Sequence, residues 1–115
     1  MNRVVITGMG AITPLGNTVT EFWDGIKNGK NGIAAITNFD ASETGISVAG
    51  EVKDFDATKY MDRKEYKRMD LFSQYAVAAS AQAVEQSGID MEKIDADRFG
   101  VTIGSGVGGF ITMES

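Results

Sequence analysis

The sequence predicts an α/β fold, and three observations support this prediction. Three consecutive β-branched residues at positions 4–6, followed by a glycine turn, are typical of a short buried strand. The alanine-rich stretch 66–87 is typical of a long helix, and the apolar run 99–103 predicts a second buried strand. A strand, helices and a strand in this order favour parallel pairing through a right-handed crossover, with the long helix covering one face of the sheet.

The composition fits one small soluble domain. The chain has 115 residues, of which 43% are hydrophobic and 23% charged, and its net charge is −5. No apolar run approaches the ~20 residues needed to cross a bilayer, and the start lacks the apolar region of a secretory signal. The absence of cysteine excludes disulfides, and the absence of histidine removes the commonest neutral-pH base and metal ligand. We therefore expect a cytoplasmic protein with no metal and with neither a membrane nor a nucleic-acid partner.

The opening strand leads into a glycine-containing turn. Gly8 and Gly10 are predicted to free the backbone where side chains would obstruct it. Pro14 and Gly16 close the segment, since proline fixes φ and lacks an amide donor.

A packing helix and a half-exposed strand are predicted next. Thr18 is a suitable N-cap, Glu21 completes a capping box, and Gly29 ends the helix. The expected buried stripe of this helix consists of Phe22, Trp23 and Ile26. Residues 30–44 are irregular, and apolar residues alternate with others over 46–52, as in a half-exposed strand. No catalytic pattern appears between residues 17 and 58.

The segment 59–68 reverses the sign of the chain's charge. Asp62 is predicted to cap a helix with Glu65 three residues later, and such a local reversal attracts an anionic partner. A solvated helix face with internal ion pairs remains the alternative. Five of the chain's eleven basic residues lie in this segment, and the last three share one face of the predicted helix: Lys59, Arg63, Lys64, Lys67 and Arg68.

The long helix 66–87 is predicted to be buried on more than one side, because small residues allow close approach. Ser87-Gly88 ends it, and residues 90–98 form a polar connector. Its expected buried stripe consists of Met69, Phe72, Ala76, Ala79 and Ala83.

A glycine-rich loop at 104–109 follows the second predicted strand and satisfies G-x-G-x-x-G. In dinucleotide-binding folds such glycines let the backbone approach a pyrophosphate. Here the pattern follows the second strand rather than the first, and no residues remain for the acidic side chain expected ~20 positions later. A nicotinamide-dinucleotide-binding oxidoreductase is therefore a weaker alternative.

The opening string VVITGMGAITPLG closely resembles the start of the β-ketoacyl-acyl carrier protein synthases, condensing enzymes of the thiolase-like superfamily. The resemblance continues through Gly32-Ile33, through the DRK and KRMD strings at 62–64 and 67–70, and to GSGVGG at 104–109. It covers essentially the whole chain and is closest to the synthase II branch of the family.

The resemblance implies a thiolase-like layered fold (αβαβα), with residues 1–115 as the first part of its N-terminal half. It implies decarboxylative Claisen condensation of an acyl thioester with malonyl-carrier protein, in fatty acid elongation. The family uses a cysteine nucleophile and two histidines, which are absent from this chain. We therefore expect the N-terminal piece of a longer enzyme, inactive alone, rather than a complete small protein.

The resemblance also implies the site residues and partners. Lys64, Lys67 and Arg68 correspond to the residues that dock the acidic acyl carrier protein. Val107, flanked by Gly106 and Gly108, corresponds to a position that faces the acyl tunnel. No cofactor is expected, because phosphopantetheine arrives on the carrier, and the full-length enzyme is expected to be a homodimer.

One alternative keeps this fold without the catalysis. Some relatives in polyketide pathways lack the cysteine and act as chain-length partners. The sequence separates neither these two functions nor different acyl chain-length preferences, and it does not give the dimer contacts.

Overall fold

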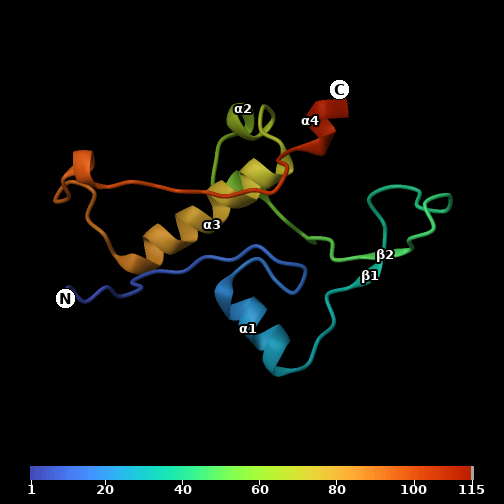
Figure 1. Cartoon of the computed structure of the whole chain (residues 1–115), viewed down its shortest axis with the longest axis horizontal. Helices are drawn as coiled ribbons and strands as arrows, with labels where there is room; N and C mark the ends of the chain where they lie inside the picture. Colours follow the sequence, from blue (N-terminus) through green and yellow to red (C-terminus); the bar gives the residue numbers. More distant parts are fainter. Residues whose placement is uncertain (115) are drawn as a thin grey trace. The chain divides into compact units, whose positions relative to one another are not determined.

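The computed structural model describes residues 1–114 and divides them into two compact units. One unit consists of residues 1–10 and 57–114, and the other of Ala11–Asp56. The larger unit contains two 3-10 helices, η1 (Ala57–Lys59) and η2 (Ala96–Arg98), and three α-helices: α2 (Arg63–Tyr66), α3 (Leu71–Ser87) and α4 (Phe110–Glu114). The smaller unit contains α1 (Val19–Lys27), β1 (Ala34–Ala35) and β2 (Val48–Ala49) (Figure 1).

The long helix α3 is the centre of the larger unit. It ends at Gly88, whose φ of 66° is left-handed, as the Ser87-Gly88 signal predicts. It begins at Leu71 rather than at Tyr66, because the chain turns between α2 and α3. Gln74 accounts for this turn: its Nε2 donates to the carbonyls of Tyr66 (3.0 Å) and Met69 (2.9 Å). These two bonds satisfy the side-chain amide, so Gln74 can be buried at 9% exposure.

The opening segment lies directly against α3. A methyl group on Gly8 would overlap the carbonyl oxygen of Ala83, and one on Gly10 would overlap that of Ala79. Met9 N donates to Gln86 Oε1 at 2.6 Å. The glycines of the opening string are therefore needed for close approach to a helix rather than for the predicted turn.

The two predicted strands of this unit do not form. Residues 4–6 and 99–103 have no strand pairing, and their side chains are exposed (91% for Val4 and 74% for Val101). The sheet that residues 1–114 form is antiparallel and two-stranded, with Ala34 opposite Ala49 and Ala35 opposite Val48. The predicted parallel pairing and the buried strands are wrong for this structure, because a strand needs a hydrogen-bonded neighbour and neither segment has one.

In the smaller unit α1 begins as predicted, but of its expected buried stripe Phe22 is half-buried, whereas Trp23 and Ile26 are exposed. Thr18 Oγ1 accepts from Glu21 N at 3.1 Å, while Glu21 Oε2 accepts from Asn17 N at 2.7 Å rather than from the cap residue itself. Trp23 is 55% exposed, and the residue of α1 that is buried is Gly25.

The hairpin β1–β2 contains part of the strand predicted over 46–52. Glu51, just after β2, holds the residues that follow β1. Its carboxylate accepts hydrogen bonds from Thr37 N, Thr37 Oγ1 and Asn38 N at 2.8–3.1 Å. These bonds lower the pKa of Glu51, with the Asn38 amide as the largest cause.

Few side chains are fully buried. The buried apolar residues are Ala57, Met61 and Ala78, and along α3 only Gln74 and Ala78 are buried. The prediction that α3 is buried on more than one side is confirmed only in part: residues 73–83 are mostly half-buried, while Leu71, Phe72, Val77 and Val84 are exposed. None of the helices in residues 1–114 is long and apolar enough to span a membrane.

Candidate functional site

The residues predicted to act in binding lie in the larger unit, some before α3 in the chain and some after it. The basic segment (Lys64, Lys67 and Arg68) precedes α3 in the chain, and the glycine-rich loop (residues 104–109) precedes α4.

The basic segment is organised by Asp62. Its Oδ1 accepts from Lys64 N (2.9 Å) and Glu65 N (3.1 Å), and Glu65 Oε2 accepts from Asp62 N (3.2 Å). This is the predicted capping box. The helix it starts has four residues, so Lys64 lies in α2, while Lys67 is its C-cap and Arg68 follows in the turn. The prediction of one continuous helix carrying all three is therefore wrong, because Gln74 holds the chain in a turn after Tyr66.

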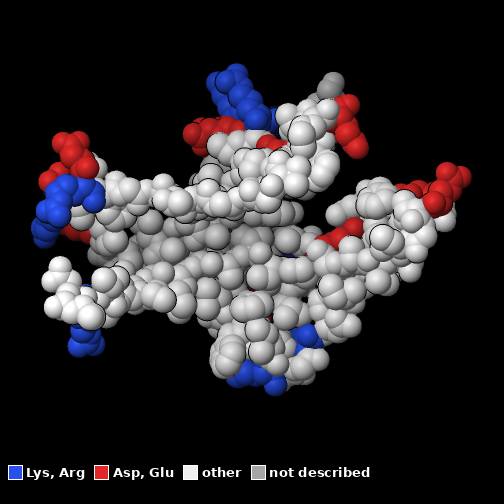
Figure 2. All heavy atoms as spheres, in the orientation of Figure 1, with Lys and Arg blue, Asp and Glu red and all other residues white. Residues whose placement is uncertain are grey.

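All three side chains of the basic segment are exposed. Figure 2 shows positive side chains projecting over the α2 region, with acidic ones beside them. The ion pairs found within residues 1–114 join Lys27 to Asp24 (2.9 Å) and Lys93 to Asp90 (3.3 Å). The internal ion pairs of the solvated-face alternative are thus not formed, which leaves these charges available to an anionic partner.

The glycine-rich loop is closed by a hydrogen bond from Gly108 N to Ser105 Oγ at 3.1 Å. Gly108 has a φ of 88°, which other residues rarely adopt. Val107 and Gly106 are exposed, Val107 to 65%. Val107 is therefore the bulky side chain at the tip of a loop that Ser105 and Gly108 hold together.

Asp70 connects the two regions, although no pattern in the sequence indicates this role. Its Oδ2 accepts from Thr112 Oγ1 at 2.7 Å and from Thr112 N at 3.2 Å, across 42 positions of sequence. The hydrogen bond from the Thr112 hydroxyl is the largest cause lowering the pKa of Asp70, with partial burial opposing it. The KRMD string contains Asp70, but only the tertiary structure brings Thr112 to it.

A pocket of about 280 Å³ lies where these regions meet. It is lined by Lys67, Arg68, Met69, Asp70, Leu71, Gln74, Ile111 and Thr112. Cationic side chains and the first turns of α3 and α4 therefore share one depression.

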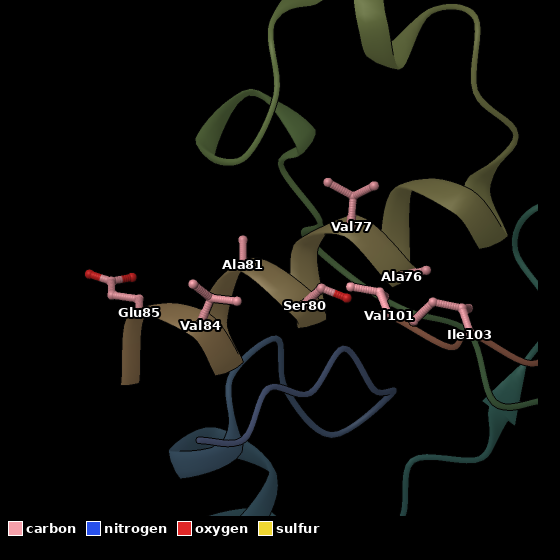
Figure 3. Close-up of a pocket in the computed structure, with 8 residues that line it drawn as sticks. All are labelled: Ala76, Val77, Ser80, Ala81, Val84, Glu85, Val101 and Ile103. Carbon is pink, nitrogen blue, oxygen red and sulfur yellow. The ribbon is translucent and has the colours of Figure 1, made fainter. Parts of the chain in front are cut away.

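A larger open groove of about 620 Å³ runs along α3 (Figure 3). Val101 and Ile103 lie beside the helix there, so the extended segment 101–103 forms one wall. From α3 the groove is lined by Ala76, Val77, Ser80, Ala81, Val84 and Glu85. Val107 lines neither this groove nor the smaller pocket. Its tunnel role stays a prediction.

The described part of the chain contains no group of three or more acidic, histidine or cysteine side chains arranged to hold a metal ion. Without cysteine or histidine, these residues also offer no thiolate or imidazole for covalent or general-base catalysis. The arrangement is suited to binding an anionic partner, because exposed cationic side chains lie near a glycine-rich loop that is closed by a hydrogen bond.

A family model described as "Beta-ketoacyl synthase, N-terminal domain" matches residues 1–115. The chain is 53% identical over 112 residues to 3-oxoacyl-[acyl-carrier-protein] synthase 2 of Synechocystis sp., covering 97% of this chain and 27% of that protein. It is 48% identical over 113 residues to the protein of the same name from Vibrio harveyi, covering 98% and 27%. The chain thus spans about a quarter of the length of these curated relatives.

Solved structures with a similar fold are also ketosynthases. The ishigamide ketosynthase/chain length factor aligns with a TM-score of 0.70 and 34% identity, over 78% of this chain and 22% of that one. A type II PKS acyl-carrier protein in complex with its ketosynthase bound to the hexaketide (AntDE:AntF, apo) aligns with a TM-score of 0.64 and 30% identity, over 85% and 24%. The matched part of these molecules therefore has the same fold as this chain.

Proposed function

The chain belongs to the β-ketoacyl synthase family, and from this premise we propose that it is the N-terminal part of a 3-oxoacyl-acyl carrier protein synthase of type II. The observation that carries the proposal is 53% identity to the Synechocystis synthase 2 over nearly the whole chain. Family membership leaves the dinucleotide-binding alternative for the glycine-rich loop without support.

The proposed reaction is decarboxylative Claisen condensation in fatty acid elongation. An acyl group passes from its carrier protein to a cysteine of the full-length enzyme, which divides one difficult step into two. Malonyl-carrier protein then loses carbon dioxide, and the resulting carbanion attacks the acyl thioester. Histidines assist decarboxylation and stabilise the oxyanion. These residues lie outside this segment, which has no cysteine or histidine and is expected to be inactive alone.

This segment's own proposed contribution is carrier docking and pocket lining. The exposed charges of Lys64, Lys67 and Arg68, which form no ion pair within residues 1–114, suit an acidic carrier protein. A solved relative contains an acyl-carrier protein in complex with its ketosynthase, which supports this partner. The prosthetic phosphopantetheine arm arrives on the carrier, so we expect the enzyme to hold no cofactor of its own. Val107, with Gly106 and Gly108, is proposed to line the acyl channel.

The proposed architecture is the thiolase-like layered fold (αβαβα), with residues 1–115 in the first part of its N-terminal half and the full-length enzyme as a homodimer. Exposed apolar segments support this proposal. Residues 4–6 and 99–103 are exposed and apolar; Val101 and Ile103 line the groove along α3, and Gly8 and Gly10, just after residues 4–6, lie against the same helix. In the full-length protein we expect further strands to pair with them.

A second candidate function is a non-catalytic chain-length partner of a polyketide synthase. The observation that favours it is the fold similarity to the ishigamide ketosynthase/chain length factor. The two functions differ in the presence of the nucleophilic cysteine beyond residue 115.

The deciding experiment uses the full-length protein with acyl-carrier protein and malonyl-carrier protein. A synthase should form a 3-oxoacyl product two carbons longer and release one carbon dioxide per condensation. Product mass and carbon dioxide are measured together, with and without an added active ketosynthase. Condensation only in the presence of the added ketosynthase, with a product length that the added ketosynthase alone does not give, would establish the chain-length partner instead.

A further inference from the structure

The glycine-rich loop is fixed at its downstream end by a side chain from the basic region. Asp70 Oδ2 accepts from both the hydroxyl (2.7 Å) and the amide (3.2 Å) of Thr112, two bonds on one carboxylate oxygen. A methyl group on Gly109 would overlap the same carboxylate, so the backbone at Gly109 touches Asp70 directly. The Asp70 carboxylate therefore contacts the chain at Gly109, the last residue of the loop, and again at Thr112 in α4.

The loop is held at two more places. A Cβ on Gly108 would lie 3.6 Å from Cζ of Phe72, so this residue rests against the first turn of α3. Ser105 Oγ accepts from Gly108 N at 3.1 Å and closes the turn that contains Val107. Val107 is thus carried by a turn whose downstream side is fastened to the start of α3.

The fastening point adjoins the basic segment. Asp70 follows Lys67 and Arg68 by three and two positions, and all three line the 280 Å³ pocket together with Thr112. The turn that leads from Tyr66 to Asp70 is itself held by Gln74, whose Nε2 donates to the carbonyls of Tyr66 and Met69. A protein docked on the basic segment would therefore sit next to the residue that holds the loop.

We propose that Asp70 is a positioning residue: through Thr112 and Gly109 it sets the position of the glycine-rich loop, and with it Val107, relative to the basic segment. This inference rests on the proposed function, in which Val107 faces the acyl chain and the basic segment docks the carrier. Its consequence is that acyl chain-length selectivity depends on a carboxylate that touches neither substrate nor nucleophile.

The test uses variants of the full-length protein. Asp70→Ala removes the acceptor, Thr112→Val removes the hydroxyl donor, and Thr112→Ser restores it. Asp95→Asn is the control, because Asp95 also accepts a backbone amide (Asp97 N, 3.2 Å) at a helix start but accepts it within its own turn rather than from the loop or from α4. Values of kcat/KM are measured with a short and a long acyl-carrier protein, alongside melting temperature.

Asp70→Ala should change the ratio of long-chain to short-chain kcat/KM by roughly tenfold, as expected for a lost charged hydrogen bond that positions a specificity residue. Thr112→Val should produce part of this change, whereas Thr112→Ser and Asp95→Asn should resemble the wild type. Equal loss on both substrates together with a lowered melting temperature, at an unchanged ratio, would show that Asp70 is only structural and overturn the inference.

Hydrogen exchange of residues 104–114 separates this inference from the proposed function. Asp70→Ala should accelerate amide exchange across this peptide whether or not the protein condenses anything. Unchanged exchange there contradicts the positioning role even if condensation is normal. Absence of condensation in the wild type contradicts the proposed function, while the exchange measurement still decides the role of Asp70.

Discussion

Val107 is the side chain on which substrate selectivity is proposed to depend. Its neighbours are glycines, one of which has a left-handed φ of 88°, so the loop cannot be rebuilt with larger residues without strain. A single β-branched side chain at such a tip can restrict a narrow apolar channel while the backbone stays fixed.

We predict that Val107→Phe in the full-length enzyme obstructs long acyl chains and spares short ones. Overpacking a tight apolar site costs about 1–3 kcal/mol, which corresponds to roughly ten- to a hundredfold in selectivity. Condensation rates with a short and a long acyl-carrier protein, together with melting temperature, check this. A proportional loss of both rates with a lowered melting temperature would mean that Val107 only packs against its neighbours.

At the level of elements, the hairpin β1–β2 depends on an ionised carboxylate. Glu51 accepts three donors from Thr37 and Asn38, and these bonds lower its pKa. Because the pKa of Glu51 is lower in the folded protein, its ionised carboxylate stabilises the fold. This stabilisation is complete at a pH above the ordinary glutamate pKa, and it is lost as the pH falls through the folded-state pKa.

We therefore predict that the amide signals of Thr37 and Asn38 shift together on acidification, with a midpoint below the ordinary glutamate pKa. Nuclear magnetic resonance of selectively labelled full-length protein measures the midpoint. Glu51→Gln should abolish this titration, and Glu43→Gln, a neighbouring carboxyl outside the contact, should leave it in place. A titration that survives Glu51→Gln would assign it to another group.

The basic segment is the second element with a testable consequence. In the full-length enzyme, reversing Lys64 and Lys67 to Glu should raise the KM for acyl-carrier protein more than it lowers kcat, because uniform binding energy is lost. The penalty should shrink at high salt, where exposed charges are screened.

The control for this prediction is Lys27→Glu with Lys30→Glu, which changes the net charge equally but lies in and after α1. The KM for acyl-carrier protein is measured for both double variants at low and at high ionic strength. If both pairs raise KM alike, the effect is one of net charge and the docking assignment fails.

For the whole molecule, the dominant feature is exposed apolar surface. Besides Val4 and Val101, large exposed side chains include Ile6, Trp23, Ile103 and Phe110. Unpaired segments and an open groove along α3 leave contiguous apolar surface in water, which is unusual for a monomeric soluble protein.

Residues 1–115 expressed alone are therefore predicted to be inactive and to aggregate or remain loosely packed. Size-exclusion chromatography, near-ultraviolet circular dichroism and thermal unfolding check this, with the full-length protein as the control. A soluble monomer with a sharp cooperative transition would contradict the prediction.

The sequence by itself determined the features that depend on neighbouring residues. The caps at Thr18 and Asp62, the end of α3 at Gly88 and the family strings are all local patterns, so they could be predicted. The need for glycine at Gly8 and Gly10 is also visible in the sequence, but its cause, contact with Ala83 and Ala79 rather than a turn, is not.

Only the tertiary structure decided which segments meet. The β-branched runs have the propensity for strands, but pairing needs a partner backbone that neither finds within residues 1–114. The sequence pattern predicts that the long helix starts at Tyr66, but α3 starts at Leu71. The Gln74 side chain donates to the carbonyls of Tyr66 and Met69 and holds a turn there, and the apolar periodicity does not predict these bonds. Asp70 and Thr112 are 42 positions apart, and no periodicity links them. Helix caps and strand propensities depend on neighbouring residues in the sequence. Burial, strand pairing and the position of the glycine-rich loop depend on contacts between residues that are far apart in the sequence.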